Sequence, residues 1–153
     1  MPLPQPNDPC PCGRLAPAGP GGSKGKSATP LPFASCCGRY LGAPGLEAMA
    51  APDAESLMRS RYTAFALGRS DYLLATWHPD TRPADLTPDT PPLRWLGLVI
   101  HAHHAGQATD TTGTVQFTAR YKAGGRAGRL TETSRFVRLA GRWVYLEGDV
   151  SAS

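Results

Sequence analysis

The side chains best suited to chemistry are four cysteines, which form two tight pairs in the first quarter of the chain. One proline separates Cys10 from Cys12, and Cys36 is adjacent to Cys37. Four thiolates are the ligand set that a closed, tetrahedral zinc site prefers. A disulfide within either pair would be badly strained. The spacing therefore favours one structural zinc ion, with cross-paired disulfides or ordinary buried cysteines as the alternatives.

A second candidate for polar chemistry is Glu132, which alternates along a predicted strand with the apolar Leu130 and Phe136. This period of two predicts that the carboxylate points inward, where it needs a basic partner. Arg59 is the first expected partner and Arg61 the second. The candidate polar residues of a core or a pocket are Glu132, Arg59, Arg61, Trp77 and His78.

Two interpretations of Glu132 stay open. A core ion pair would fix a helix against the sheet, whereas a polar anchor would belong to a ligand pocket. Catalysis would also require a second convergent acid or base, and His78 and Asp71 are the side chains available. The sequence places neither of them near Glu132, so these residues do not establish an enzyme.

Three histidines near the end of a predicted strand are weaker metal-ligand candidates. His101 and His103 are two residues apart and would share a face, with His104 beside them. A second metal site is conceivable from this spacing, but no cysteine or carboxylate is close in sequence. A solvated strand end is the preferred interpretation.

Two basic segments could meet phosphate groups. In Gly-Gly-Ser-Lys-Gly-Lys-Ser at 21–27, Pro20 stands where a phosphate-binding loop requires glycine, so we expect a flexible linker. A predicted hairpin carries Arg120, Lys122, Arg126 and Arg129. Because no aromatic stacking pattern accompanies these four, the sequence favours a solvated edge over a nucleic-acid site.

The elements that must position these residues are two helices and four strands. Asp53 is placed to cap a helix that ends at Gly68, and Ser70 to cap a second helix from Asp71 to Trp77. The expected apolar face of the first helix consists of Ala54, Leu57, Met58, Tyr62 and Phe65. The predicted strands are 93–103, 114–122, 130–139 and 142–147, with a hairpin at Ala140-Gly141. This order predicts an α+β fold, with the helices on one face of a curved antiparallel sheet.

Composition divides the chain near residue 52. The segment before it holds all four cysteines and has too few large apolar side chains for a core, so metal or cross-links must order it. Residues 15–32 are rich in Gly, Pro, Ala and Ser and should form a flexible loop. The net charge of +4 does not demand nucleic acid. Without an apolar span or a secretory signal, we expect a soluble cytoplasmic protein with no membrane partner.

Cys-Pro-Cys-Gly at 10–13 with Cys-Cys-Gly at 36–38 resembles the SEC-C motif, a short zinc-binding module known from the tail of the SecA translocation ATPase. Further blocks in the same order resemble the bacterial YchJ-like family: 55–65, 71–83, 113–121, 132–138 and 141–145. The resemblance implies a nuclear transport factor 2-like cone, with the four cysteines as zinc ligands. One departure is the separation of the two pairs by 23 residues, where SEC-C modules have a short link. Each doubling of a loop costs only about 0.6 kcal/mol, so the site should tolerate it.

These observations lead to a two-part prediction. Residues 1–45 should form a SEC-C-like zinc module with a flexible insertion at 15–32, and residues 46–153 a nuclear transport factor 2-like α+β domain. The expected function is a protein-binding or adaptor module with structural zinc. The alternatives are a small-molecule-binding protein or enzyme that uses the cone cavity and, third, nucleic-acid binding.

Overall fold

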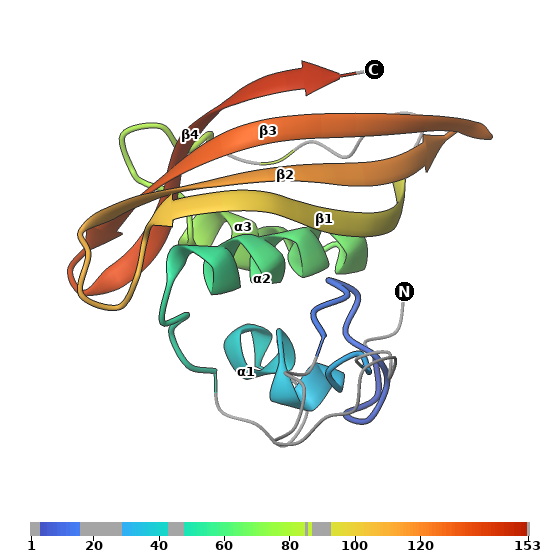
Figure 1. Cartoon of the computed structure of the whole chain (residues 1–153), viewed down its shortest axis with the longest axis horizontal. Helices are drawn as coiled ribbons and strands as arrows, with labels where there is room; N and C mark the ends of the chain where they lie inside the picture. Colours follow the sequence, from blue (N-terminus) through green and yellow to red (C-terminus); the bar gives the residue numbers. More distant parts are fainter. Residues whose placement is uncertain (1–3, 16–28, 43–47, 85, 87–92, 153) are drawn as a thin grey trace, which may run out of the picture.

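A four-stranded antiparallel sheet with helices on one face forms the larger part of the structure (Figure 1). The computed structural model describes residues 4–15, 29–42, 48–84, 86 and 93–152. The strands follow chain order: β1 (Leu93–Ala105), β2 (Thr112–Ala123), β3 (Arg126–Leu139) and β4 (Arg142–Ala152). Helices α2 (Ala54–Leu67) and α3 (Ser70–Ala75) precede them. The α+β architecture predicted from the order of elements is confirmed.

Helix α2 begins and ends where the sequence predicts. The Asp53 carboxylate accepts a hydrogen bond from the backbone N–H of Ser56 at 2.7 Å, and Gly68 closes the helix at a φ of 73°. Helix α3 differs from the prediction because it already includes Ser70 and ends at Ala75, two residues before Trp77. Arg69, not Ser70, occupies its N-cap position, without a side-chain capping bond.

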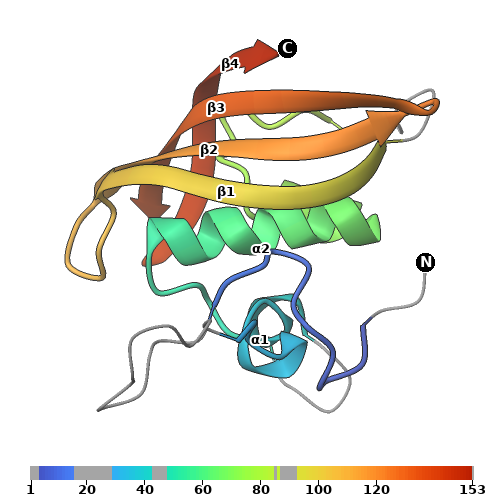
Figure 2. The ribbon, with the colours of Figure 1, turned by 45° about the vertical axis from the view of Figure 1, so that its right-hand side comes forward.

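The N-terminal segment packs on the side of α2 that faces away from the sheet (Figure 2). It contains the 3-10 helix η1 (Phe33–Ser35) and the short helix α1 (Gly38–Leu41), neither of which was predicted. Because α2 is covered on two sides, Ser60, Arg61 and Thr63 are as buried as its apolar residues. The expected apolar face does not include these polar residues, which are buried all the same, whereas Phe65, assigned to that face, is 43% exposed.

One hydrophobic core joins the two parts of the chain. It includes the four cysteines and Phe33 from the N-terminal segment, Leu57 from α2, and Phe136 from β3. At the base of the predicted loop 15–32, Leu15 bridges to Pro30, and Pro9 bridges to Pro32 nearby. Residues 16–28, which include the glycine-rich segment 21–27, lie outside the described residues. No helix in the described part of the chain is long and apolar enough to cross a membrane.

A close backbone contact fixes the start of α2 against the sheet. The backbone N–H of Ala54 donates to the carbonyl of Gly106 at 2.9 Å. Gly113, on β2, lies directly against Gly106, and a Cβ on Gly113 would come within 2.7 Å of the Gly106 nitrogen. The glycine at 113 is therefore required by space, since neither backbone can move without disturbing the helix start.

We expect Gly113→Ala to lower the free energy of unfolding by about 2–3 kcal/mol, as overpacking does in a confined site. Gly97→Ala is the matched control, because a Cβ on Gly97 in β1 meets no atom within 4 Å. Urea unfolding of both variants measures the difference. Equal midpoints for the two variants would contradict the close contact.

Candidate metal centre

The four cysteines converge, as the sequence predicts, in one buried cluster. Their sulfur atoms all lie within 4.8 Å of one another, and each residue is at most 4% exposed. Cys12 Sγ and Cys36 Sγ are 3.6 Å apart. That is too long for a disulfide bond of about 2.05 Å and close to the edge, about 3.8 Å, of a tetrahedron with metal–sulfur bonds of about 2.3 Å. The donor set and its spacing fit a single tetrahedral metal ion.

Two turns position the cysteine pairs. The backbone N–H of Cys10 donates to Leu31 at 3.0 Å, and that of Gly13 donates back to Cys10 at 3.0 Å, with Gly13 at a φ of 74°. This places Cys10 and Cys12 on one tight turn. Cys36 and Cys37 lie where η1 passes into α1, so their sulfur atoms reach the first pair from a second rigid turn.

The electrostatics of the cluster also favour a cation. Hydrogen bonds from the other three thiols lower the pKa of Cys10, so one thiolate is stable there. For Cys37 the effect is the opposite: hydrogen bonds with the other three thiols, that with Cys10 first, raise its pKa, and burial raises it further. The pKa of Cys12 is lowered too, although Cys10 opposes this shift, so a third and a fourth thiolate would face both repulsion and desolvation. A bound divalent cation would remove this conflict because it compensates several thiolates at once.

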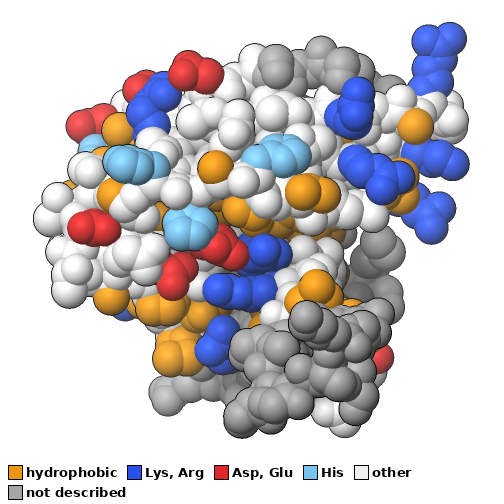
Figure 3. Space-filling model, in the orientation of Figure 1, with side chains coloured by type: hydrophobic (Ala, Val, Ile, Leu, Met, Phe, Trp, Pro, Cys, Tyr) orange, Lys and Arg blue, Asp and Glu red, His pale blue; other side chains and the backbone are white. Residues whose placement is uncertain are grey.

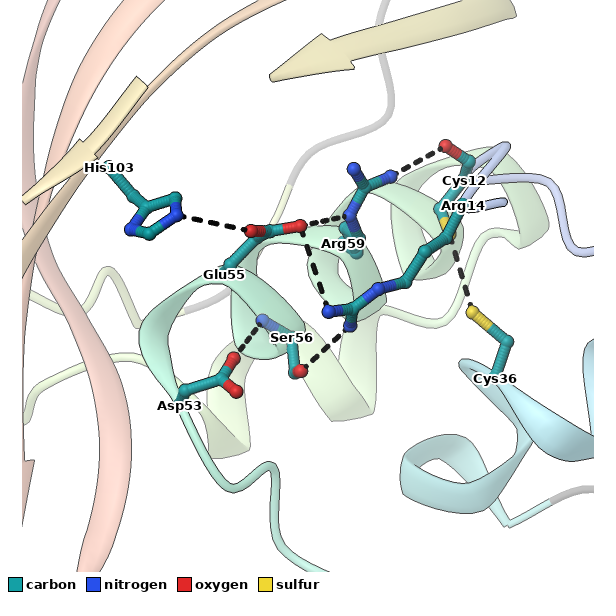
Figure 4. A network of polar contacts seen from close by, with 8 residues as sticks. All are labelled: Cys12, Arg14, Cys36, Asp53, Glu55, Ser56, Arg59 and His103. Carbon is teal, nitrogen blue, oxygen red and sulfur yellow. Dashed lines mark hydrogen bonds and ion pairs between the residues drawn. The ribbon is translucent and has the colours of Figure 1, made fainter. Parts of the chain in front are cut away.

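A polar network connects the cysteine turn to α2 and β1 (Figure 4). Arg59 donates from Nε to Glu55 at 2.8 Å and from a terminal nitrogen to the Cys12 carbonyl at 3.3 Å. Arg14 donates to the Ser56 hydroxyl at 3.0 Å and lies 3.9 Å from Glu55. Burial lowers the pKa of Arg59, but the bond to Glu55 and the negative charge of Cys12 raise it by more. Two arginines thus lie beside a cluster that carries net negative charge when it holds a divalent metal.

The network corrects the expected partner of Glu132. Arg59 pairs with Glu55, one helical turn away, and turns toward the cysteines. It does not enter the cone, by which we mean the interior between α2, α3 and the sheet. The Glu132 carboxylate instead accepts a hydrogen bond from the hydroxyl of Ser134, and its charge acts on the nearby Tyr145. The first-choice pair of Glu132 with Arg59 was therefore wrong. The physical reason is that the N-terminal segment covers the side of α2 from which Arg59 projects.

Arg61 is the arginine that lies inside the cone. It is 3% exposed, and its terminal nitrogen donates to the Leu73 carbonyl and the Thr76 hydroxyl at 2.8 Å each. Its guanidinium carbon lies 5.1 Å from the Trp77 ring centroid and 4.7 Å from that of Tyr145. Burial lowers the pKa of Arg61 to about 10, while nearby charges, including that of Glu132, oppose the shift. Arg61, Trp77 and Glu132 thus surround Tyr145.

His78, the remaining candidate, turns to a different partner. Its backbone N–H donates to the Tyr145 carbonyl at 2.8 Å, but its Nδ1 accepts from the backbone N–H of Asp80 at 3.0 Å. No contact between the His78 ring and Glu132 is present in the described residues. His78 therefore fixes the chain after α3 rather than completing an acid–base pair.

The histidines of β1 do not converge. A β-bulge between Ile100 and Ala102 breaks the alternation that would have put His101 and His103 on one face. His101 contacts the Thr118 hydroxyl at 2.7 Å on the outer face, whereas His103 approaches Glu55 of α2 at 3.8 Å. Within the described residues, the four cysteines are the only group of metal-ligating side chains that lie close enough together to share an ion. The expected shared face was wrong.

Sequence reasoning missed Arg14, Ser56 and Thr63 as neighbours of the cluster. Thr63 Oγ1 lies 3.9 Å from Cys10 Sγ. The spacing of Glu55 and Arg59 by four residues was visible in the sequence and is typical of an intrahelical pair. Nothing in the sequence indicated that the N-terminal segment packs on this side of α2.

Two partly buried tyrosines predict how stability depends on pH. Burial raises the pKa of Tyr72 and of Tyr145 to about 12, from an ordinary value of 10.0. Since the folded state holds them neutral, their contribution to stability is complete below pH 10 and is lost as the pH rises to 12. We expect the thermal midpoint to fall across this interval. Tyr72→Phe and Tyr145→Phe should each make this fall in the thermal midpoint smaller. A fall as large as that of the parent in both variants would contradict the raised pKa of these tyrosines.

Known proteins place this arrangement in a family. Residues 53–148 match the family model described as YchJ, middle NTF2-like domain. The UPF0225 protein of Bordetella pertussis is 48% identical over 141 residues, which are 92% of each chain. The UPF0225 protein of Chromobacterium violaceum is 53% identical over 121 residues, 78% of this chain and 87% of that one.

Two solved structures are similar along most of the chain. A SEC-C motif containing protein from Rhodopseudomonas palustris has a TM-score of 0.66 and 30% identity, covering 79% of this chain and 93% of that one. A SEC-C motif containing protein from Psychrobacter arcticus has a TM-score of 0.66 and 29% identity, covering 95% and 84%. With its four-cysteine cluster beside a nuclear transport factor 2-like fold, this chain belongs to the YchJ-like family of UPF0225 proteins.

Proposed function

We propose that the four cysteines hold one structural zinc ion and that the module ordered by this ion acts as a protein-binding adaptor. The observation that carries the proposal is the convergence of four buried thiols within 4.8 Å. Zinc fits because it prefers four sulfur ligands in a closed site and needs no open position for a structural role. In this account the metal determines the shape of a docking surface.

The docking surface that we propose is a pocket of about 240 Å³ where the N-terminal segment meets the cone. Its walls come from four elements: Tyr40 of α1, Leu57 of α2, Tyr72 of α3 and Trp143 of β4. Tyr40 follows the ligand Cys37 by three residues and its backbone N–H donates to the Cys37 carbonyl at 2.9 Å. Loss of the metal would therefore remove one wall of the pocket.

The partner is expected to be an acidic protein segment with a large apolar side chain. The pocket is lined mostly by alanine, leucine and aromatic side chains, which suit an apolar anchor. The exposed Arg142 also lines it and makes no ion pair within the described residues, so it is available to a carboxylate of the partner.

Affinity capture with matched variants tests this function. Ala75 lines the pocket and is exposed, so Ala75→Glu should fill the pocket and repel an acidic segment. Ala127→Glu adds the same charge at an exposed position on β3 and serves as the control. We expect a partner protein that is retained by the parent and by Ala127→Glu but lost with Ala75→Glu and after metal removal. If Ala75→Glu retains as much of the partner protein as the parent does, the adaptor role of this pocket is overturned.

A small-molecule site in the cone is the second candidate. The observation in its favour is the polar group of Arg61, Glu132 and Tyr145 between helix and sheet. Neither the pocket at Tyr40 nor a second one of about 280 Å³, which includes His104 and Phe136, is lined by Arg61 or Glu132. The residues in the cone fit a structural polar core better than an open site, so the adaptor is preferred.

A further inference from the structure

The outer face of the sheet, which points away from the helices, carries a group of cations at one end. On β2, Phe117 and Ala119 are buried toward α2, so the alternating Arg120 and Lys122 point outward and are exposed. Figure 3 shows basic side chains gathered at the end of the molecule where β2 turns into β3. The sheet therefore has one charged face beyond the site described above.

The strand register brings four cations together on this face. Arg94 of β1 lies opposite Lys122, and Arg120 lies opposite Arg129 of β3. We name Arg94, Arg120, Lys122 and Arg129 the outer-face basic cluster. Like charges directly opposite each other destabilise a sheet. The arrangement thus costs stability in the free protein and would be relieved by a polyanion.

The other arginine of the outer face provides a contrast. Arg135 lies 3.2 Å from Glu147 and 3.0 Å from Asp149, so its charge is compensated within the sheet. No member of the outer-face basic cluster makes an ion pair with any carboxylate among the described residues. The arginine at one end of the face is therefore paired within the sheet, whereas the cations at the other end are not.

We propose that the outer-face basic cluster binds the phosphodiester backbone of a duplex nucleic acid, a role separate from the adaptor pocket. Its neighbours leave space for a backbone, since Gly97 lies opposite Arg120 and Ala127 opposite Lys122. The cross-strand pair Thr118 and Thr131 lies next to the cluster on the same face and adds two hydroxyls, 2.8 Å apart, that suit phosphate oxygens.

A duplex is favoured over a single strand because the described residues offer no stacking platform at this end of the face. The aromatic residues of these strands that lie next to the cluster, Trp95 and Tyr121, are on the helix side, where their ring centroids are 5.8 Å apart. Binding to single strands depends on such rings. The sequence alone favoured a solvated edge, because it does not show that Arg94 of β1 lies opposite Lys122 and Arg120 opposite Arg129.

The test measures binding of a short labelled DNA duplex, and of an RNA duplex of the same sequence, by the full chain. Four phosphate contacts predict that affinity falls roughly 100-fold between 50 and 200 mM salt. The double variant Arg120→Gln/Arg129→Gln should lower this loss to about tenfold. Because it removes a like-charge pair, it should also melt at or above the temperature of the parent, which separates lost binding from lost folding.

Arg82→Gln is the matched control for the single variant Arg129→Gln, since Arg82 is exposed, outside the sheet and without an ion pair among the described residues. We expect Arg129→Gln to weaken binding and Arg82→Gln to leave it unchanged. Equal binding by the parent and the double variant would overturn the proposal. So would tighter binding of poly-glutamate than of either duplex, because an acidic polypeptide would then be the preferred partner.

Discussion

Removal of the metal with a chelator should unfold the N-terminal segment and leave the sheet folded. The cluster supplies the order that this segment lacks in apolar side chains, and structural zinc contributes about 10 kcal/mol or more in small zinc-binding peptides. Amide hydrogen exchange is the measurement. The backbone N–H groups of Cys10, Gly13 and Tyr40, which are hydrogen-bonded around the cysteines, should lose protection, whereas those pairing β2 with β3 should keep it.

The thermal midpoint should also fall on chelation, because Ser56 and Thr63 of α2 lose their contacts with Arg14 and Cys10. Addition of zinc should restore both protection and midpoint, and magnesium, which prefers oxygen ligands, should restore neither. Loss of all cooperative unfolding on chelation would contradict the two-part account and would mean that the shared core folds only as one unit.

Arg61→Ala should destabilise the protein by about 3–5 kcal/mol, the largest effect expected of any single substitution in the cone. The substitution would leave the Leu73 carbonyl and the Thr76 hydroxyl without their donor. It would also open a cavity between the rings of Trp77 and Tyr145. Chemical denaturation measures the loss, and Arg61→Lys should recover only part of it, because an ammonium cannot stack as a planar guanidinium does.

Arg69→Ala is the control for this prediction. Arg69 follows the end of α2 and pairs at 2.9 Å with Asp71, whose side chain is 70% exposed, so its loss should cost less than about 1 kcal/mol. A similar, small loss for both variants would show that the guanidinium of Arg61 contributes little inside the cone.

Much of the fold could be predicted because local chemistry marks its boundaries. Asp53 and Gly68 delimit α2 through a cap and a left-handed turn, and the hairpin at Ala140-Gly141 has positive φ at both residues. The burial of Thr63 beside Cys10 could not be predicted. It arises from packing of the N-terminal segment against α2, a contact between distant parts of the chain that leaves no periodic pattern.

The candidate site residues likewise include some that the sequence predicts and some that it does not. The cysteine cluster could be predicted because residue type and number define a metal site almost independently of the fold. The partner of Glu132 could not, since Arg59 and Arg61 are two residues apart and only the packing decides which of them enters the cone. The β-bulge at His101 shows a further limit, because one extra residue reverses the face of the side chains that follow it.

Metal analysis of the protein purified in reducing buffer without added metal tests the central claim most directly. Native mass spectrometry combined with elemental analysis should give one zinc ion per chain, with four cysteines that become reactive to thiol reagents only after chelation. The burial of all four thiols in one cluster is the basis of this expectation. A metal-free protein with two disulfides, or a chain that carries a different metal at full occupancy, would contradict the assignment of structural zinc.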